Sequence, residues 1–382
     1  MQNFIYHNPT KVVFGKAAIS KLGKVLPSNK KVLVLYGGGS IKKNGVYDQL
    51  TEQLKETHWV EFSGIEANPE YTTLMRAVEL AKTEQIEFIL AVGGGSVVDG
   101  AKFVAAAINV EGDAEEILND SSIVKSAVPM GCILTLPATG SETNTASVVN
   151  ISEKQAKKAF MSEHVRPQFA ILDPEVTYSL PDRQLANGVA DAFVHVVEQY
   201  LTYPVNAMVQ DRFAESILQN LIELGPKVKE TDYEVRANLM WNATQALSGL
   251  IGAGVPQDWS THMIGHQLTA LYGLDHAVTL AIVLPRLLKS QQPEKRDKLL
   301  QYARRVWGIS SEDENAAIEK AITKTEEFFR ELGIKTKLSE HDIDATAEDK
   351  VAHLLETQGL TALGEHGKVD VSTAKQIIAA SM

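Results

Sequence analysis

The residues of this sequence best suited to chemistry are one aspartate and a group of histidines in its second half. Asp191 and His195 stand four residues apart in one apolar run, and His262 and His266 stand four apart in another. Residues at i and i+4 lie on one face of a helix, and a carboxylate or imidazole on a buried helix needs a partner. His276 follows ten residues after His266, behind a Gly-Leu-Asp turn. The pattern predicts two helices whose polar side chains converge with His276 on one ion.

One carboxylate oxygen and three imidazole nitrogens form a ligand set that suits Fe²⁺, Zn²⁺ or Mn²⁺. The alternative is a set of core histidines that are satisfied by hydrogen bonds and hold no ion. The clustering of three of the ten histidines within residues 262–276 favours the metal site. The histidines outside both runs lie in polar or scattered settings, and we interpret them as surface or structural residues: His7, His58, His164, His341, His353 and His366.

The elements around these residues follow two patterns that divide the chain. Short β-branched and leucine-rich runs predict buried parallel strands at residues 31–36, 87–92, 133–136 and 170–172. Amphipathic helices between them, such as residues 69–85, complete a β-α-β rhythm. After Pro181 the strand signals stop and helices follow one another, as at residues 313–332, where Gly333 supplies the stop. We therefore predict an α/β domain at residues 1–180 and a helical domain at 181–382.

The composition excludes several classes of protein. An apolar fraction of 44% is typical of a globular protein, and a net charge of −11 argues against binding a phosphate backbone. Cys132 is the only cysteine, so no disulfide can form within the chain, which fits a reducing compartment. Residues 1–10 lack the pattern of a signal peptide, and no apolar segment approaches the length of a membrane span. We expect a soluble cytoplasmic protein with neither nucleic-acid nor membrane partners.

Two glycine clusters follow predicted strands and indicate nucleotide binding. Residues 93–95 and Ser96 lie between a strand and a helix at residues 97–108. Glycines at such a place let a pyrophosphate approach the backbone, and the helix N-terminus favours its charge. Residues 37–39 with Ser40 are a looser analogue, since the strict G-x-G-x-x-G fingerprint is absent. The alternative for this first cluster is an ordinary turn.

Taken together, these motifs resemble those of the iron-containing (group III) alcohol dehydrogenases. The resemblance rests on residues 188–199, the spacing His262-x3-His266-x9-His276, the run from Gly93 to Lys102 and residues 135–142 (TLPATGSE). It extends along the whole chain, and residues 35–45 and 252–259 bring it nearest to the NADPH-dependent butanol dehydrogenases and broad-range aldehyde reductases. The resemblance implies a dehydroquinate synthase-like fold, with an α/β N-terminal dinucleotide-binding domain and an all-α C-terminal domain, in a protein that is usually a homodimer.

The resemblance also implies a role for each site residue. The metal ligands of the family fall on Asp191, His195, His262 and His276. The extra histidine near metal and substrate falls on His266, which we interpret as a proton relay because imidazole exchanges protons near neutral pH. The cofactor-binding positions that the glycine motifs and the family pattern indicate are Gly38, Ser40, Gly94, Gly95, Ser96, Asp99, Thr135, Thr139, Asn144 and Lys157.

The first glycine cluster bears on the choice of dinucleotide. Relatives that prefer NAD carry an acidic residue just beyond the first strand, where it would repel a 2′-phosphate, and this sequence has Gly38 there. Ser40 is a donor to a phosphate oxygen, and Lys42 or Lys43 would supply charge, the alternative being that both lysines are ordinary solvated residues. Lys157 lies in a charged stretch, so a solvent-exposed hairpin is its alternative. We expect NADP(H) to be preferred over NAD(H).

The sequence thus predicts an oxidoreductase that moves a hydride between NADP(H) and a small primary alcohol or aldehyde, with a divalent metal polarising the substrate oxygen. The alternatives are a glycerol or polyol dehydrogenase, a dehydroquinate synthase-like lyase of the same fold, and a sensor without turnover. A lyase with a polyanionic substrate would need lysines and arginines around the site, and a polyol would favour polar neighbours. The residues that we expect to surround the site are apolar: Phe193, Val194, Phe213, Trp259, Met263 and Leu268.

Overall fold

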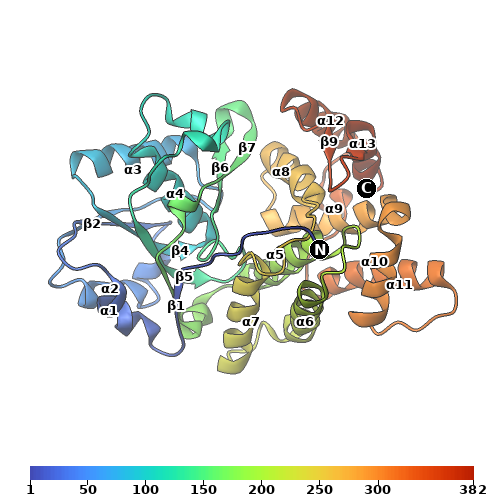
Figure 1. The fold of residues 1–382 in the computed structure, drawn as a ribbon, viewed down its shortest axis with the longest axis horizontal. Helices are drawn as coiled ribbons and strands as arrows, with labels where there is room; N and C mark the ends of the chain where they lie inside the picture. The colour runs from blue at the N-terminus through green and yellow to red at the C-terminus, as the bar shows by residue number, and fades with distance from the viewer. The chain divides into compact units, whose positions relative to one another are not determined.

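The structure, a computed structural model of residues 1–382, falls into two units (Figure 1). The sheet unit comprises His7–Pro181 and Thr231–Thr244, and the helical unit comprises Met1–Tyr6, Asp182–Glu230 and Gln245–Met382. The predicted boundary after residue 180 places residues 1–6 with the sheet and residues 231–244 with the helices. In the structure, residues 1–6 belong to the helical unit and residues 231–244 to the sheet unit. The division at that boundary into separately folding domains stays a prediction.

The sheet unit is built on six parallel strands, most of them runs of buried apolar residues, as expected for strands covered on both faces. In sheet order they are β1 (Lys11–Phe14), β8 (Phe169–Leu172), β5 (Met130–Leu136), β4 (Phe88–Gly94), β2 (Val32–Tyr36) and β3 (Trp59–Phe62). The four predicted strands correspond to β2, β4, β5 and β8. The two edge strands, β1 and β3, were not predicted, because each has only four residues and these are partly exposed, without a run of buried positions.

Alternate residues of the strands face two separate apolar cores. Leu33 and Leu35 of β2 belong to the core on one face, and Val32 and Val34 belong to the core on the other. The first core is completed by α3 (Tyr71–Thr83) and α4 (Gly95–Ala107), and the second by α1 (Leu22–Val25) and α2 (Val46–Gln53). Figure 1 shows the two pairs of helices on opposite sides of the sheet.

The order of the strands creates a switch point between β2 and β4. After β2 the chain continues to β3 on one side, whereas after β4 it continues to β5 on the other. Ligands of open α/β sheets bind beyond the carboxyl ends of the strands at such a point. The unit is completed by an antiparallel hairpin of β6 (Ala146–Ile151) and β7 (Ala156–Met161) and by α7 (Tyr233–Ala246).

The helical unit contains eight helices and one very short hairpin. The helices are α5 (Asp182–Tyr200), α6 (Met208–Leu224), α8 (Ser260–Tyr272), α9 (His276–Ser290), α10 (Gln292–Arg305), α11 (Glu314–Glu331), α12 (Ala347–Thr357) and α13 (Val371–Ala379). The hairpin of β9 (Ala362–Leu363) and β10 (Val369–Asp370) is the one exception to the expected all-α character. None of the helices combines the length and the apolar character that crossing a membrane requires.

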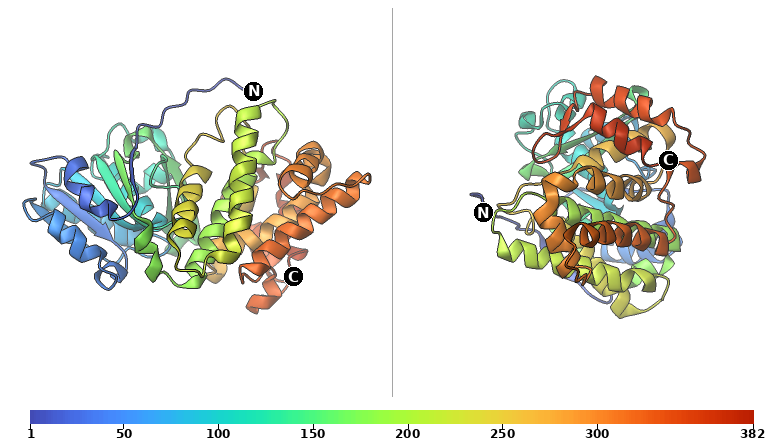
Figure 2. Two further views of the ribbon diagram at one scale, coloured as in Figure 1. Left: turned by 90° about the horizontal axis from the view of Figure 1, so that it is seen from below. Right: turned by 90° about the vertical axis from the view of Figure 1, so that its right-hand side faces the viewer.

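Helix α5 contacts α6 and α9, and Figure 2 shows the helices of this unit, coloured from green to red, from two further directions. All residues of α5 from Val189 to Tyr200 are buried, and the polar side chains of Asp191, His195 and Glu198 share one face, whereas most of the other buried side chains are apolar. Phe193 packs its ring against Phe328 and Phe329 of α11, at centroid distances of 5.2 and 5.7 Å. Helix α11 begins and ends as its sequence predicts, with Asp313 accepting two backbone N–H groups and Gly333 at φ +83°.

Candidate functional site

Three imidazoles of the helical unit converge on one carboxylate oxygen. Asp191 and His195 lie on one face of α5, with His195 Nε2 3.6 Å from Asp191 Oδ1. His262 Nε2 of α8 lies 4.0 Å from the same oxygen, and Nε2 of His276, the first residue of α9, lies 3.7 Å from it. The ligand atoms of Asp191, His195 and His262 all lie within 4.8 Å of one another. The structure therefore brings Asp191, His195, His262 and His276 together.

This arrangement fits a divalent cation. Asp191 is 4% exposed, and its Oδ1 accepts no hydrogen bond, which is costly for a buried carboxylate unless a cation meets it. The three Nε2 atoms are too far from Oδ1 for hydrogen bonds. Ligand atoms around one tetrahedral ion stand about 3.4 Å apart when each bond is about 2.1 Å long. The observed separations are close to that spacing, so the donor set suits a metal better than a network of hydrogen bonds.

A second carboxylate, Glu198, holds one of these histidines and was not predicted as a site residue. It is buried on α5, its Oε2 contacts Nδ1 of His262, and its Oε1 accepts the Thr261 backbone N–H at 2.5 Å. A carboxylate on Nδ1 turns Nε2 toward Asp191, as outer carboxylates do for metal-bound histidines. Burial raises the pKa of Glu198, and the charge of Asp258 adds to that rise. Its spacing, i+7 from Asp191 on the same helix face, is a signal that could have revealed it.

His266 lies beside the converging imidazoles. It is buried one turn beyond His262 on α8, with its ring centroid 5.3 Å from that of His276 and 6.2 Å from that of His262. The three imidazoles that come within 4.0 Å of Asp191 Oδ1 are those of His195, His262 and His276. Its placement therefore suits a role next to the ligands, as expected, and leaves the proton relay a matter for experiment.

Three of the apolar residues that we expected around the site lie elsewhere. Phe193 and Leu268 are fully buried and face apolar cores, and Phe213 is exposed on α6. Helix periodicity could have shown this for two of them, because Phe193 lies two positions from both Asp191 and His195, and Leu268 lies two positions from His266, so both point away from these pairs. Trp259 does lie at the site, with its ring centroid 5.3 Å from that of His262.

The predicted cofactor residues of the sheet unit gather at the carboxyl ends of three neighbouring strands. Gly38 and Ser40 follow β2, Gly94 ends β4 and is followed by Gly95 and Ser96, and Thr135 and Thr139 lie at the end of β5. These ends flank the switch point between β2 and β4, where a dinucleotide is expected. The pairing of β4 with β5 shifts register between Gly93 and Gly94, so the strand is irregular where the glycine cluster begins.

Close packing at this edge requires glycine, as Gly95 shows. A Cβ on Gly95 would lie 2.2 Å from the Thr139 Oγ1 atom, so only glycine lets the loop after β5 approach the start of α4 this closely. At Gly38, by contrast, a Cβ would meet nothing within 4 Å. The space beside Gly38 is therefore open.

A buried lysine, Lys102, fixes the loop that follows β5. Its ammonium is fully buried on α4 and donates to Ser141 Oγ at 2.8 Å, Asn144 Oδ1 at 2.8 Å and the Ala146 carbonyl at 2.7 Å. Burial lowers the pKa of Lys102 to about 8, an effect that the nearby Asp99 opposes. Lys102 ends the family motif that begins at Gly93, but the sequence does not predict it as a site residue.

Asp99 and Asn144, both predicted to bind the cofactor, also hold this loop. Asp99 accepts the Ser141 hydroxyl on Oδ1 at 2.5 Å and the Val148 N–H on Oδ2 at 3.1 Å. Asn144 Oδ1 accepts from Lys102 and from a backbone N–H. Burial raises the pKa of Asp99. Asp99 and Asn144 therefore hydrogen-bond to other residues of the chain, and these bonds position residues 141–148 beside α4.

The lysines considered for charge differ in their contacts. Lys42 Nζ lies 3.2 Å from Glu61 Oε1 and 4.6 Å from the centre of the Tyr47 ring, and hydrogen bonds to Tyr36 and Glu61 raise its pKa. Lys157 lies on the β6–β7 hairpin, half-buried, and donates to an asparagine, Asn68, at 3.1 Å. The hairpin named in the alternative for Lys157 is present, but Lys157 itself is half-buried on it and not exposed to solvent.

Comparison with known proteins points to one family. Residues 9–174 match the model of iron-containing alcohol dehydrogenase, and residues 185–380 match the C-terminal model of the Fe-containing alcohol dehydrogenase family. The chain is 53% identical to the NADPH-dependent aldehyde reductase YqhD of Escherichia coli (strain K12), over 100% of both chains. It is 40% identical to the NADH-dependent butanol dehydrogenase A of Clostridium acetobutylicum, over 89% of each chain.

The crystal structure of YqhD from E. coli K-12 has the same fold, with a TM-score of 0.98 over 100% of this chain and 99% of that one. The predicted fold class, an α/β domain followed by a helical one, is thereby confirmed, as are the predicted resemblance and the class of enzyme. The chain belongs to the iron-containing alcohol dehydrogenase family.

Proposed function

We propose that this protein transfers a hydride between NADPH and small aldehydes, in reversible exchange with the corresponding alcohols, at a metal site formed by Asp191, His195, His262 and His276. The observation that carries the proposal is the convergence of three Nε2 atoms on the buried Asp191 Oδ1 atom, which accepts no hydrogen bond. The NADPH-dependent aldehyde reductase at 53% identity supports the substrate class. The donor set suits Fe²⁺ or Zn²⁺, and Mn²⁺ as a third choice.

A metal bound there supplies Lewis-acid polarisation of the substrate oxygen. The chain's own residues do the rest. Glu198 on His262 Nδ1 keeps the Nε2 lone pair available. The apolar packing of α5 and α8 limits water around the site. We assign the proton transfer to the imidazole of His266, which lies beside His262 and His276.

The cofactor supplies the hydride, and we propose that it is held at the carboxyl ends of β2, β4 and β5. Gly38 carries no charge to repel a 2′-phosphate, and Ser40 offers a hydroxyl. Lys42 is engaged by Glu61, so the exposed Lys43 is the better candidate for direct charge. The cofactor set is otherwise the predicted one: Gly38, Ser40, Gly94, Gly95, Ser96, Thr135, Thr139 and Lys157 as direct contacts, with Asp99 and Asn144 acting through the loop.

We further propose that the protein works in the cytoplasm, as its sequence indicates, and as a homodimer, as the family resemblance alone implies. A single lone cysteine that is fully buried is compatible with a reducing compartment.

The test is the loss of NADPH absorbance with butyraldehyde. Protein stripped by a chelator is reloaded with Zn²⁺, Fe²⁺ or Mn²⁺, and each sample is assayed with NADPH and with NADH. We expect turnover only after reloading, with the higher kcat/KM for NADPH. His276→Ala is expected to abolish it, whereas His353→Ala, a histidine exposed on α12, serves as the matched control. Turnover by the stripped protein at the reloaded rate would contradict the metal assignment, and equal kcat/KM values for both dinucleotides would contradict the cofactor preference.

A further inference from the structure

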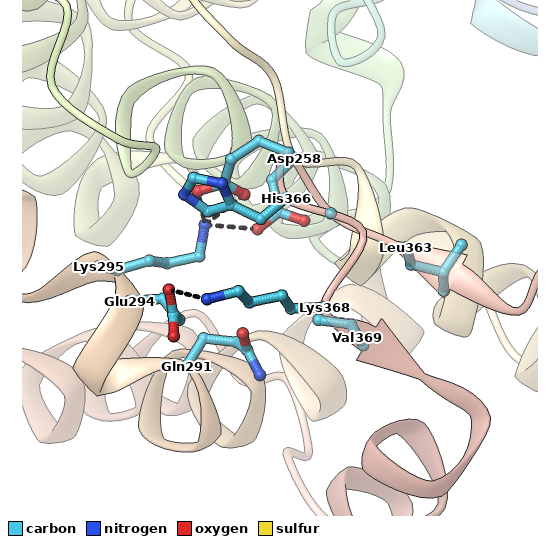
Figure 3. A pocket seen from close by; sticks show the side chains of 10 residues that line it. Asp258, Gln291, Glu294, Lys295, Leu363, His366, Lys368 and Val369 are labelled. Carbon is cyan, nitrogen blue, oxygen red and sulfur yellow. Dashed lines mark hydrogen bonds and ion pairs between the residues drawn. The ribbon is translucent and has the colours of Figure 1, made fainter.

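A buried lysine of the helical unit, Lys295, joins three elements that are distant in the sequence. It lies on α10 and is 3% exposed. Its ammonium is 2.7 Å from Asp258 Oδ2 and 2.8 Å from Glu365, and it donates to the Leu201 carbonyl at 2.7 Å. Figure 3 shows the ammonium pointing toward the Asp258 carboxylate at the edge of a small polar pocket. One cation therefore connects α10, the residue preceding α8 by two positions and the turn between β9 and β10.

The Asp258 carboxylate divides its two oxygens between Lys295 and the start of α8. While Oδ2 meets the lysine, Oδ1 accepts the Ser260 backbone N–H at 2.9 Å and contacts the Ser260 hydroxyl. Between them, Trp259 adopts φ +63°, a left-handed conformation that a non-glycine residue takes only when its surroundings impose it. The first turn of the helix thus depends on how Asp258 is held.

The same turn leads directly to the candidate metal ligand. The Asp258 backbone N–H donates to the Glu198 carbonyl at 2.9 Å, and the Glu198 side chain accepts from Thr261 and contacts His262. Four consecutive positions, from Asp258 to Thr261, are therefore fixed against two anchors, Lys295 on one side and Glu198 on the other. Displacing either anchor moves the imidazole of His262.

The turn between β9 and β10 also contacts Lys295 and the start of α8. Glu365 supplies the second carboxylate for Lys295, and a Cβ on the neighbouring Gly364 would come within 3.1 Å of Ser260 Oγ and 3.4 Å of Asp258 Oδ1. Burial lowers the pKa of Lys295, but Asp258 and Glu365 outweigh that effect and raise it. A buried charged cluster is poor evidence for stability, because well-packed apolar residues often stabilise a protein as much or more. A positional role explains its presence better.

We propose that Lys295 is a positioning residue: through Asp258 it fixes the start of α8 and so sets where His262 stands in the metal site. This inference rests on the metal assignment of the proposed function. Lys295 touches neither substrate nor metal ligand, so its removal acts on metal affinity and on ligand geometry, with any change in turnover following from these.

The chain offers a matched control three residues along the same helix. Lys298 is also buried on α10 and pairs with a carboxylate, Asp211 Oδ1, at 2.6 Å. Its ammonium lies 4.1 Å from the centre of the Tyr200 ring, and its partner belongs to α6. Lys298→Met removes a buried ion pair of the same kind without touching the start of α8. The two lysine variants therefore separate a general loss of stability from a specific effect on the site.

The experiment titrates metal-free protein with Co²⁺ and records the visible absorption bands, which report the ligand geometry, together with the Tm without metal. We expect both Lys295→Met and Lys298→Met to lower the Tm. Only Lys295→Met should weaken Co²⁺ binding, by about tenfold or more, and alter the bands. Should Lys295→Met fail to fold, Asp258→Asn takes its place, since it keeps the acceptor for Ser260 but weakens the link to Lys295.

Two results overturn the inference while leaving the metal assignment intact: a wild-type Co²⁺ affinity and spectrum in the Lys295 variant, or an equal loss of affinity in Lys298→Met. Failure of the wild-type protein to bind one Co²⁺ would instead overturn the metal assignment, and this inference with it.

Discussion

Replacing Glu198 with glutamine keeps the shape of the side chain but changes what it offers to His262. In the native protein, one carboxylate oxygen accepts from the Thr261 N–H and the other contacts His262 Nδ1. A glutamine has one acceptor and one donor. If the acceptor stays on Thr261, the amide N–H₂ faces Nδ1, which must then give up its proton, so the proton moves to Nε2. If the amide turns round, two donors meet at the Thr261 N–H.

Either arrangement of the glutamine amide weakens metal binding, and by a similar order of magnitude. The first places a proton on the nitrogen that faces Asp191, and the second leaves a buried N–H without an acceptor, at a cost of about 1–3 kcal/mol. Loss of an outer carboxylate from a metal-bound histidine weakens metal binding about 10- to 100-fold. We therefore expect the Kd for Zn²⁺ to rise by that factor in Glu198→Gln, which corresponds to about 1.4–2.7 kcal/mol.

The assay is a competition titration of metal-free protein with Zn²⁺ and a chromophoric chelator. Glu215→Gln is the control, because Glu215 is also a buried glutamate, on α6, and accepts from Tyr200 and Arg305 at 3.0 Å. We expect Glu215→Gln to lower the free energy of unfolding and to leave the Kd for Zn²⁺ unchanged. A Zn²⁺ affinity in Glu198→Gln equal to that of the wild type would refute the argument that this carboxylate orients His262.

Three further predictions concern separate parts of the molecule. His266→Ala should lower kcat by about 10²- to 10⁴-fold while the bound metal, measured by elemental analysis, stays near one per chain; loss of metal would show that His266 is a ligand. Lys102→Met leaves the buried Asp99 carboxylate without its nearby cation, so the loop at residues 141–148 should become less ordered. The Kd for NADPH, measured by cofactor fluorescence, should then rise about tenfold. An unchanged Kd would exclude a role of the loop in cofactor binding. Although burial acts to raise the pKa of Glu326, hydrogen bonds from Thr336 and Arg286 lower it below 4.5, so its stabilising effect is present above that pH and is lost as the pH falls through the lower value in the folded protein. Glu326→Gln should accordingly lower the Tm more at neutral pH than at about pH 3, and a Tm difference that grows on acidification would reverse the assigned sign.

Much of the site follows from periodicity alone. The four-residue spacings of Asp191 with His195 and of His262 with His266 place each pair on one helix face, and the apolar neighbours show that the helices are buried. The position of His276 is less determined by the local sequence. It is the first residue of α9, and only the packing of that helix against α5 and α8 brings its Nε2 near Asp191.

What the sequence did not reveal depends on contacts between distant segments. Glu198 has the right spacing, but its function becomes visible only when α8 is placed against it. Lys102 is one residue of an apolar helix until the loop after β5 folds onto it. The spacing of Phe193 from Asp191 and His195 turns it away from the site, but its partners on α11 are visible only in the structure. The placement of residues 231–244 in the sheet unit is likewise a matter of tertiary contacts, such as that between Phe14 and Trp241.

The central claim, that the converging side chains hold a metal, is tested most directly by anomalous X-ray scattering. Crystals of Zn²⁺-loaded protein would be measured on both sides of the zinc absorption edge. We predict a single strong peak within about 2.0–2.2 Å of Asp191, His195, His262 and His276. No peak at this position, or a peak held by other residues, would contradict the account.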